Sequence, residues 1–238
     1  MNTRTLQTTG NNRIDQKLLV AVFLRLLLAA LLTLGVIGAY LGYLQLFGNF
    51  APVIPGELYR SAQPTPARLQ SYVERHKIRS IINLRGENEG RDWYDDEVAT
   101  ARELGIVHID FGISARKELT REKAEQLIDL MRDAPKPLLI HCKAGADRSG
   151  LASALYLAAL AGQSEAVAEQ QLSLYFGHLP LPFIAEQAMD RTFEALEPWL
   201  GFQPQRNDAE PHHVFTTGST SSRRIAPAQL TASSASLP

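Results

Sequence analysis

A long apolar run near the N-terminus limits what this chain can fold into more than any other feature. Residues 18–47 are apolar almost throughout, and Arg25 is the only charged residue among them. Residues 26–47 alone would form a helix about 33 Å long at about 1.5 Å per residue, which is enough to cross the hydrocarbon core of a bilayer. We therefore expect one N-terminal transmembrane helix over residues 18–47 rather than a buried core helix.

The charges before this run indicate how it would be oriented. Residues 1–17 are polar, and Arg4, Arg13 and Lys17 outnumber Asp15 there. The positive-inside rule places such a segment in the cytoplasm, so the rest of the chain would face the periplasm of a bacterium-like cell. A cleaved signal peptide is the alternative, but the length of the run and the lack of a small-x-small cleavage site favour a retained anchor.

Two glycines inside the run raise the question of self-association. Gly38 and Gly42 form a G-x-x-x-G pattern, which lets two membrane helices approach closely. Glycine is also common in membrane helices for other reasons, so dimerisation is possible but unsupported by the sequence.

Composition limits the function of the remainder. The chain has 238 residues, a formal net charge of −1 and 45% hydrophobic residues, which suits one medium domain with appendages. We place this domain at 48–202 and a disordered tail, rich in Ser, Thr, Ala and Pro, at 203–238. Near-neutral charge gives no support to nucleic-acid binding, and a single cysteine rules out an internal disulfide.

Within 48–202, short apolar runs alternate with helix-forming runs. This alternation predicts an α/β fold with a parallel-rich central sheet flanked by helices. Strands are expected just before Ser61 and at 78–84, 106–111 and 138–141. Helices are expected from Pro66, through the acidic stretch that Gly105 closes, and at 120–131, 150–161, 164–176 and 183–196. We take Thr65 and Thr120 as N-caps and the acidic stretch, Glu87 to Glu97, as a solvated helix face.

The segment 138–150, LLIHCKAGADRSG, carries the chemistry. An apolar strand stops at the only cysteine, Cys142, and a helix-forming run begins after Ser149. A tight loop between a strand and a helix N-terminus turns backbone N–H groups inward and makes an anion site. Such a site favours Cys142 as a nucleophilic thiolate. The planar guanidinium of Arg148 can hold two oxygens of a phosphate, and Gly145 lets the backbone turn closely.

These residues resemble the signature of the cysteine-dependent protein tyrosine phosphatases, in their compact dual-specificity branch. The resemblance implies that Cys142 forms a phosphocysteine and that Arg148 binds the phosphoryl group. It further implies that Ser149 assists the departing thiolate and that His141 tunes Cys142 from behind. The substrate-binding loop would then comprise Lys143, Ala144, Gly145, Ala146, Asp147, Arg148 and Ser149. No metal or cofactor is expected, because Arg148 and the loop amides supply the charge stabilisation.

The general acid is less clear from the sequence. The family usually keeps an aspartate on a separate loop before the cysteine, but residues 110–118 read DFGISARKE. Asp147, inside the signature, is the first candidate, since some bacterial and lipid-directed relatives use an aspartate there. Asp110 at a strand end is the second, and Glu118 is the third.

Several substrates and roles stay open. We expect a phosphotyrosyl protein as partner and substrate, with phosphoserine or phosphothreonine possible. Lys143 and the Lys-Ala-Gly run resemble inositol-lipid phosphatases, although Ala146 stands where those relatives usually have a second lysine. A membrane-tethered phosphate-binding pseudophosphatase is another alternative. A rhodanese-like sulfurtransferase also uses a loop cysteine, but the Arg148-Ser149-Gly150 end fits phosphate better.

A second segment supports the same family. Residues 59–64, YRSAQP, resemble the opening of some small bacterial and fungal phosphatases of this class. Arg60 would either line the rim of the active site or form a structural ion pair, and the sequence does not choose between these roles.

Overall fold

The computed structural model describes the backbone of residues 11–202 and the side chains of residues 16–202. The predicted tail at 203–238 and the first ten residues of the predicted N-terminal segment therefore lie outside the described residues. The apolar run forms α1 (Asn11–Phe47), which begins earlier than the run itself. Residues 11–17 contain neither proline nor glycine, so nothing in them ends the helix.

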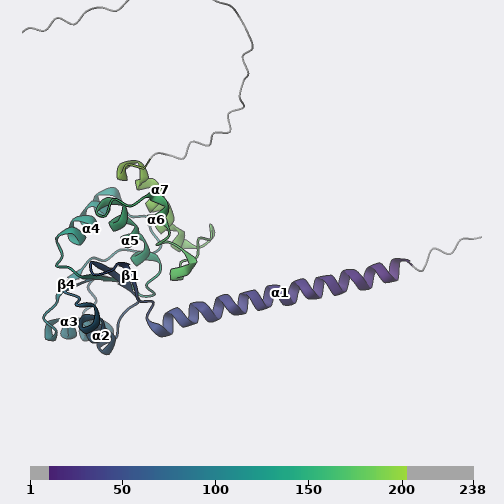
Figure 1. Cartoon of the computed structure of the whole chain (residues 1–238), viewed down its shortest axis with the longest axis horizontal. Helices are drawn as coiled ribbons and strands as arrows, with labels where there is room; N and C mark the ends of the chain where they lie inside the picture. Colours follow the sequence, from purple (N-terminus) through teal and green to yellow (C-terminus); the bar gives the residue numbers. More distant parts are fainter. Residues whose placement is uncertain (1–10, 203–238) are drawn as a thin grey trace, which may run out of the picture. The chain divides into compact units, whose positions relative to one another are not determined.

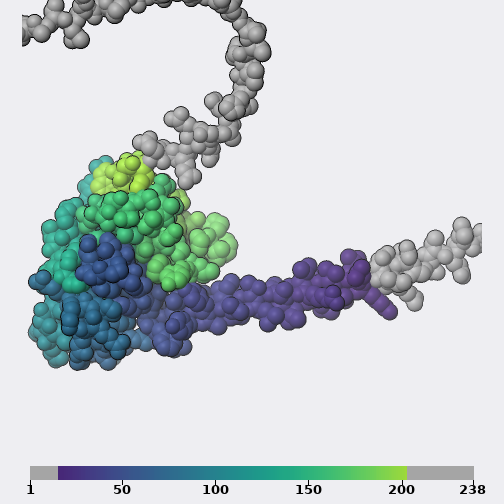
Figure 2. Space-filling model, in the orientation of Figure 1, coloured from purple at the N-terminus to yellow at the C-terminus, as the bar shows by residue number. Residues whose placement is uncertain are grey.

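Helix α1 has the length and composition of a membrane span. Its segment Gln16–Phe47 is long and apolar enough to cross a bilayer, and the most apolar part of it is not buried by the rest of the chain. Figure 2 shows these uncovered side chains in purple and blue. The prediction of one N-terminal apolar helix of spanning length is confirmed.

The remaining chain forms a five-stranded sheet with the order β1-β2-β5-β3-β4. Its strands are β1 (Ala51–Ile54), β2 (Leu58–Ser61), β3 (Ser80–Asn83), β4 (Val107–Asp110) and β5 (Leu138–His141). Strand β1 runs antiparallel to β2, and the other neighbouring strands run parallel. The predicted α/β class with a parallel-rich sheet is confirmed.

Helices cover both faces of this sheet (Figure 1). One face carries α2 (Pro66–His76) and α3 (Asp92–Glu103), and the other carries α4 (Arg121–Asp133), α5 (Asp147–Ala159), α6 (Glu165–Glu169) and α7 (Ala188–Leu200). Successive residues of β5 point to opposite faces. Leu138 and Ile140 belong to the larger core cluster beneath α4, α5 and α7, while Leu139 belongs to the smaller one beneath α2.

Several local predictions are confirmed. The side chains of Thr65 and Thr120 cap α2 and α4, where they accept hydrogen bonds from the backbone amides of Arg68 and Lys123. Helix α5 is buried almost all round, as expected of the central helix. It begins at Asp147 rather than at Gly150, so the last residues of the signature already belong to its first turn.

Two helix predictions are wrong in extent. The helix expected over 164–176 ends at Glu169 and is followed by a turn and by the 3₁₀ helix η1 (Leu174–Phe176). This break brings the Gln171 carbonyl onto Arg60. The helix expected from Phe183 begins at Ala188, after the 3₁₀ helix η2 (Ala185–Gln187). Prolines at 180 and 182 lie in the non-helical segment between η1 and η2.

Candidate active site

The carboxyl ends of the parallel strands meet at one edge of the sheet. Cα pairing places Ser61 beside His141, Asn83 beside His141, and Asp110 beside Asn83. The chain leaves β5 at this edge, forms the loop of residues 142–146 and enters α5. In α/β sheets this edge is where ligands bind, so the topology places the loop where a substrate site is expected.

Cys142 lies at the base of the loop. Its side chain is buried, and its Sγ lies 3.5 Å from Oγ of Ser149 in the first turn of α5. The structure therefore brings together the predicted nucleophile and the hydroxyl predicted to assist it.

The loop takes its shape because several of its carbonyls are bonded from outside. Nη2 of Arg60 donates to the carbonyls of Gly145 and Ala146, at 2.9 and 2.8 Å. The backbone N–H of Gln63 donates to the carbonyl of Lys143. In a peptide unit the C=O and N–H point in opposite directions, so outward carbonyls leave the amides that follow them facing the inside of the loop.

Gly145 is required by this turn. Its φ is +70°, and a Cβ there would lie 2.5 Å from the backbone nitrogen of Ala62. A side chain at this position would push the loop off β2.

Arg60 lies behind the loop rather than on the rim of the site. Its side chain is fully buried, its Nη1 donates to the carbonyl and the Oε1 of Gln171, and its guanidinium stacks on the ring of Phe176. The rim interpretation is therefore wrong, and the partners of Arg60 are carbonyls instead of a carboxylate. Burial lowers the pKa of Arg60, and the nearby Cys142 and Asp147 oppose this shift. A guanidinium stays charged in proteins.

Arg148 lies between the end of β3 and the segment that follows β4. Its Nη1 lies 3.3 Å from the carbonyl oxygens of Leu84 and Ile113. Its Nε is buried and has no hydrogen-bond partner among the described residues. A buried N–H without a partner is costly, and an anion in the loop would supply one.

A second arginine stands near the first. Nη1 of Arg85, two residues beyond the end of β3, donates to Oε1 of Gln63, and its guanidinium lies 3.3 Å from the ring centre of Trp93. Burial lowers the pKa of Arg85, and the positive charge of Arg148 lowers it further. The sequence reasoning did not single out this second cation.

His141 is held by a buried carboxylate. Its Nε2 lies 3.1 Å from Oε1 of Glu97, and the same oxygen lies 2.9 Å from Nε2 of His108. Burial alone would raise the pKa of Glu97, but His141 and His108 outweigh it and lower that pKa to about 2. Placing Glu97 on a solvated face was wrong. It lies on the buried side of α3 with Tyr94 and Ala101, a helical spacing that the sequence contains.

Asp110 is hydrogen-bonded at the strand edge. Its Oδ1 accepts from the amide of Asn83 at 2.8 Å, and its Oδ2 accepts from the hydroxyl of Tyr94 at 2.6 Å. Burial and this second hydrogen bond raise the pKa of Tyr94. The third acid candidate, Glu118, is exposed and paired with Arg191 on the surface.

Asp147 belongs to a chain of three side chains. Its Oδ1 lies 2.8 Å from Nδ1 of His178, whose Nε2 lies 2.8 Å from Oδ2 of Asp190. Burial alone would lower the pKa of His178, but the hydrogen bonds to the two carboxylates outweigh it and raise that pKa to about 9. Sequence reasoning missed His178, which is remote from the signature in the sequence.

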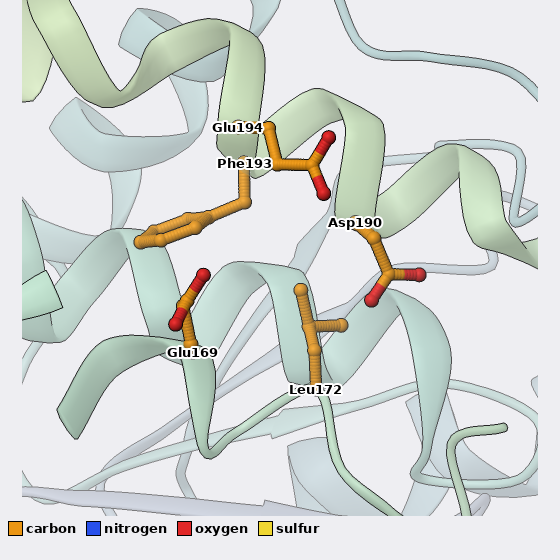
Figure 3. Close-up of a pocket in the computed structure, with 5 residues that line it drawn as sticks. All are labelled: Glu169, Leu172, Asp190, Phe193 and Glu194. Carbon is orange, nitrogen blue, oxygen red and sulfur yellow. The ribbon is translucent and has the colours of Figure 1, made fainter. Parts of the chain in front are cut away.

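Asp190, the last of these three hydrogen-bonded side chains, also lines a pocket between α6 and α7 (Figure 3). The pocket is lined by Glu169, Leu172, Asp190, Phe193 and Glu194. The close-up shows the carboxylates of Glu169, Asp190 and Glu194 at its rim. Burial raises the pKa of Glu169, and its acidic neighbours raise it further.

Residues 41–173 match the model of the tyrosine phosphatase family. The tyrosine-protein phosphatase-like protein OCA2 of Saccharomyces cerevisiae is 27% identical over 132 residues. That match covers 54% of this chain and 66% of the yeast protein, so this chain spans just under two thirds of its relative.

One solved structure shows a similar fold. The core catalytic domain of the PP-IP phosphatase SIW14 from S. cerevisiae superposes with a TM-score of 0.50 and 21% identity, over 66% of this chain and 94% of that one. P. aeruginosa TpbA in complex with pTyr superposes with a TM-score of 0.49 and 18% identity, over 64% of this chain and 90% of that one.

The family match spans more than half of the chain and includes both Cys142 and Arg148. This chain belongs to the tyrosine phosphatase family.

Proposed function

We propose that this chain hydrolyses phosphotyrosine on proteins through a phosphocysteine intermediate, and that phosphoserine and phosphothreonine are weaker substrates. The observation that carries the proposal is the buried Cys142, with Ser149 at 3.5 Å and with the buried, unpartnered Nε of Arg148 in the first turn of α5, which follows the loop. The family description and the name of the yeast relative support a tyrosyl substrate.

The reaction has two steps. In the first, the Cys142 thiolate attacks phosphorus, and the bond to the tyrosyl oxygen breaks as that oxygen receives a proton from a general acid. In the second, water attacks the phosphocysteine and gives its proton back to the same residue, while the S–P bond breaks. Ser149 donates a hydrogen bond to the departing thiolate. Arg148 and the inward amides hold the phosphoryl oxygens through both steps.

We propose Asp147 as the general acid, with Asp110 as the second candidate. Asp147 follows the loop directly, and one of its oxygens is fixed by His178, which leaves Oδ2 for the leaving oxygen. Both oxygens of Asp110 accept hydrogen bonds from neighbouring side chains. A general acid must bring its proton within hydrogen-bond reach of the leaving group.

The proposal is tested with the full chain in detergent. Hydrolysis of an aryl phosphate is followed in excess chelator, beside Cys142→Ser. We expect activity that the substitution abolishes. In the wild-type chain we expect an initial burst of product followed by slower turnover, and a phosphocysteine that can be trapped. Activity that survives in Cys142→Ser would exclude cysteine catalysis. Phosphate binding without turnover in the wild-type chain would favour the pseudophosphatase.

A phosphorylated inositol is the alternative substrate. Lys143 is exposed on the loop and Arg85 is half-buried near Arg148, so cations beyond Arg148 are available to a substrate with several phosphates. Phosphotyrosyl peptides and phosphoinositides in vesicles are compared at equal concentrations. Higher kcat/KM on the peptides is the expected result, and higher kcat/KM on the lipids would replace the proposed substrate.

We also propose that α1 is retained as a membrane anchor, with the N-terminus in the cytoplasm and the catalytic domain in the periplasm. The length of the span Gln16–Phe47 and the basic residues before it support this orientation. Protease added to intact spheroplasts should digest the domain, and protection would reverse the orientation. Gly38 and Gly42 keep dimerisation of the anchor open, which cross-linking in vesicles would detect.

A further inference from the structure

The end of α1 contacts the catalytic loop directly. The carbonyl oxygen of Ala144 accepts two hydrogen bonds from side-chain amides, one from Asn49 at 3.0 Å and one from Gln45 at 3.2 Å. Gln45 lies in the last turn of α1, and Asn49 lies two residues beyond that helix. The reaction steps described above use neither residue.

Asn49 is held firmly from several sides. It is buried, its φ is +44°, and its backbone N–H donates to the carbonyl of Leu44 at 2.8 Å. Its Nδ2 also donates to the carbonyl of Phe176 in η1 at 2.8 Å. The backbone amide of Asn49 therefore bonds the last turn of α1, and its side-chain amide bonds the loop and η1.

Asn49 bonds a carbonyl of the loop that Arg60 and Gln63 do not bond. The carbonyls of Gly145 and Ala146 are held by Arg60, and that of Lys143 by the amide of Gln63. The carbonyl of Ala144 depends on Asn49 and on the more exposed Gln45. Turning this carbonyl outward aims the next amide, that of Gly145, into the loop.

We propose that Asn49 is a positioning residue of the catalytic loop, and that through it the end of α1 is coupled to the anion site. The inference rests on the proposed phosphatase chemistry for its kinetic consequence. Its consequences for anion binding and for the reactivity of Cys142 do not require turnover. An anchor that ends on the loop makes the geometry of the site depend on how α1 ends.

The test uses the full chain in detergent with two substitutions at Asn49. Asn49→Gly removes the side chain and tolerates the positive φ. Asn49→Asp keeps the shape but replaces the donor with an acceptor that faces two carbonyls. Tyr40→Phe is the matched control, because it removes a hydrogen bond from the same helix to the Tyr175 carbonyl without touching the loop.

Three experiments are made: steady-state kinetics on an aryl phosphate, which give kcat and KM, a titration that gives the affinity for vanadate, and the pH profile of iodoacetamide alkylation. The alkylation reports on one site, because Cys142 is the only cysteine. For Asn49→Gly we expect kcat and vanadate affinity to fall about tenfold. This is the effect of losing one hydrogen bond to a charged group, here the bond from the misdirected amide of Gly145 to the anion in the loop. We expect the alkylation profile to move to higher pH, because a misdirected amide stabilises the thiolate less.

The outcomes separate this inference from the proposed function. A lower melting temperature with unchanged kcat, vanadate affinity and alkylation profile would make Asn49 merely structural and overturn the inference. Wild-type values in both variants would overturn it as well. If the wild-type chain shows no turnover, the proposed function fails, and vanadate affinity and alkylation still decide the role of Asn49. We expect Tyr40→Phe to match the wild-type chain in all three experiments.

Discussion

Nε2 of His141 lies 3.1 Å from Oε1 of Glu97, and both side chains are buried behind the cysteine that follows His141. The same carboxylate oxygen also meets His108, and Oε2 accepts a hydrogen bond from Gln63. One carboxylate thus joins α3 to the central strand β5. His141, which precedes Cys142, is therefore held by the buried carboxylate of Glu97.

The Glu97 carboxylate should make stability depend on acid pH. Its pKa falls from 4.5 to about 2 in the folded chain, so its contribution is present above pH 4.5 and is lost as pH falls towards 2. Over that range the wild-type chain should lose about 3 kcal/mol through this group. Urea unfolding between pH 2 and 7 should show a shallower acid slope for Glu97→Gln. Equal slopes would contradict the prediction.

His178 should act in the opposite direction at alkaline pH. Its pKa rises from 6.5 to about 9 on folding, so its contribution is full below pH 6.5 and is lost as pH rises through 9. Denaturant unfolding at pH 6, 8 and 10 should show this loss in the wild-type chain. His178→Asn should unfold more easily at pH 6 and approach the wild type at pH 10. A constant difference between the two chains would rule out titration of His178.

The proposed general acid can be tested through leaving groups. Asp147→Asn should lower kcat/KM about 100-fold for aryl phosphates with poorly acidic phenols. It should change little for dinitrophenyl phosphate, whose leaving group needs no proton. The slope of log kcat/KM against phenol pKa should therefore become steeper. An unchanged slope would transfer the role to Asp110, and Asp110→Asn should then show the steep slope.

Arg60 should matter to folding as well as to catalysis. Arg60→Met would leave the carbonyls of Gly145, Ala146 and Gln171 without their buried donor. We expect the free energy of unfolding to fall by about 3 kcal/mol or more, the cost of losing several hydrogen bonds from one buried guanidinium. Phosphate affinity should fall at the same time, because the loop amides lose their direction. Arg75→Met, at an exposed position on α2, should change the unfolding free energy by less than about 0.5 kcal/mol.

Local signals in the sequence predicted much of the fold. Alternating apolar runs predicted the parallel sheet, and Thr65 and Thr120 predicted the starts of two helices. The spacing from Cys142 to Arg148 predicted the loop between β5 and α5. Each of these signals involves residues close together in the chain, where turn, cap and periodicity preferences act directly.

The supporting residues of the site could not be predicted in the same way. Asn49 meets Ala144, Glu97 meets His141 and His178 meets Asp147 only after distant segments have packed together. A polar residue in one sequence gives no indication of which distant carbonyl or ring it will meet. The helix expected over 164–176 failed for the same reason, because Arg60 bonds the carbonyl at Gln171, where the helix has already ended.

The outward carbonyls of the loop also bear on the order in which the chain is made. Apart from the amide of Gly150, which bonds the Ala146 carbonyl within the first turn of α5, their donors lie on Gln45, Asn49, Arg60 and Gln63, and these four residues precede Cys142 in the sequence. Because synthesis runs from the N-terminus, the ribosome has added every one of these four residues before it adds the cysteine. Cys142 is therefore added to a chain that already contains the residues that bond the carbonyls of its loop from outside.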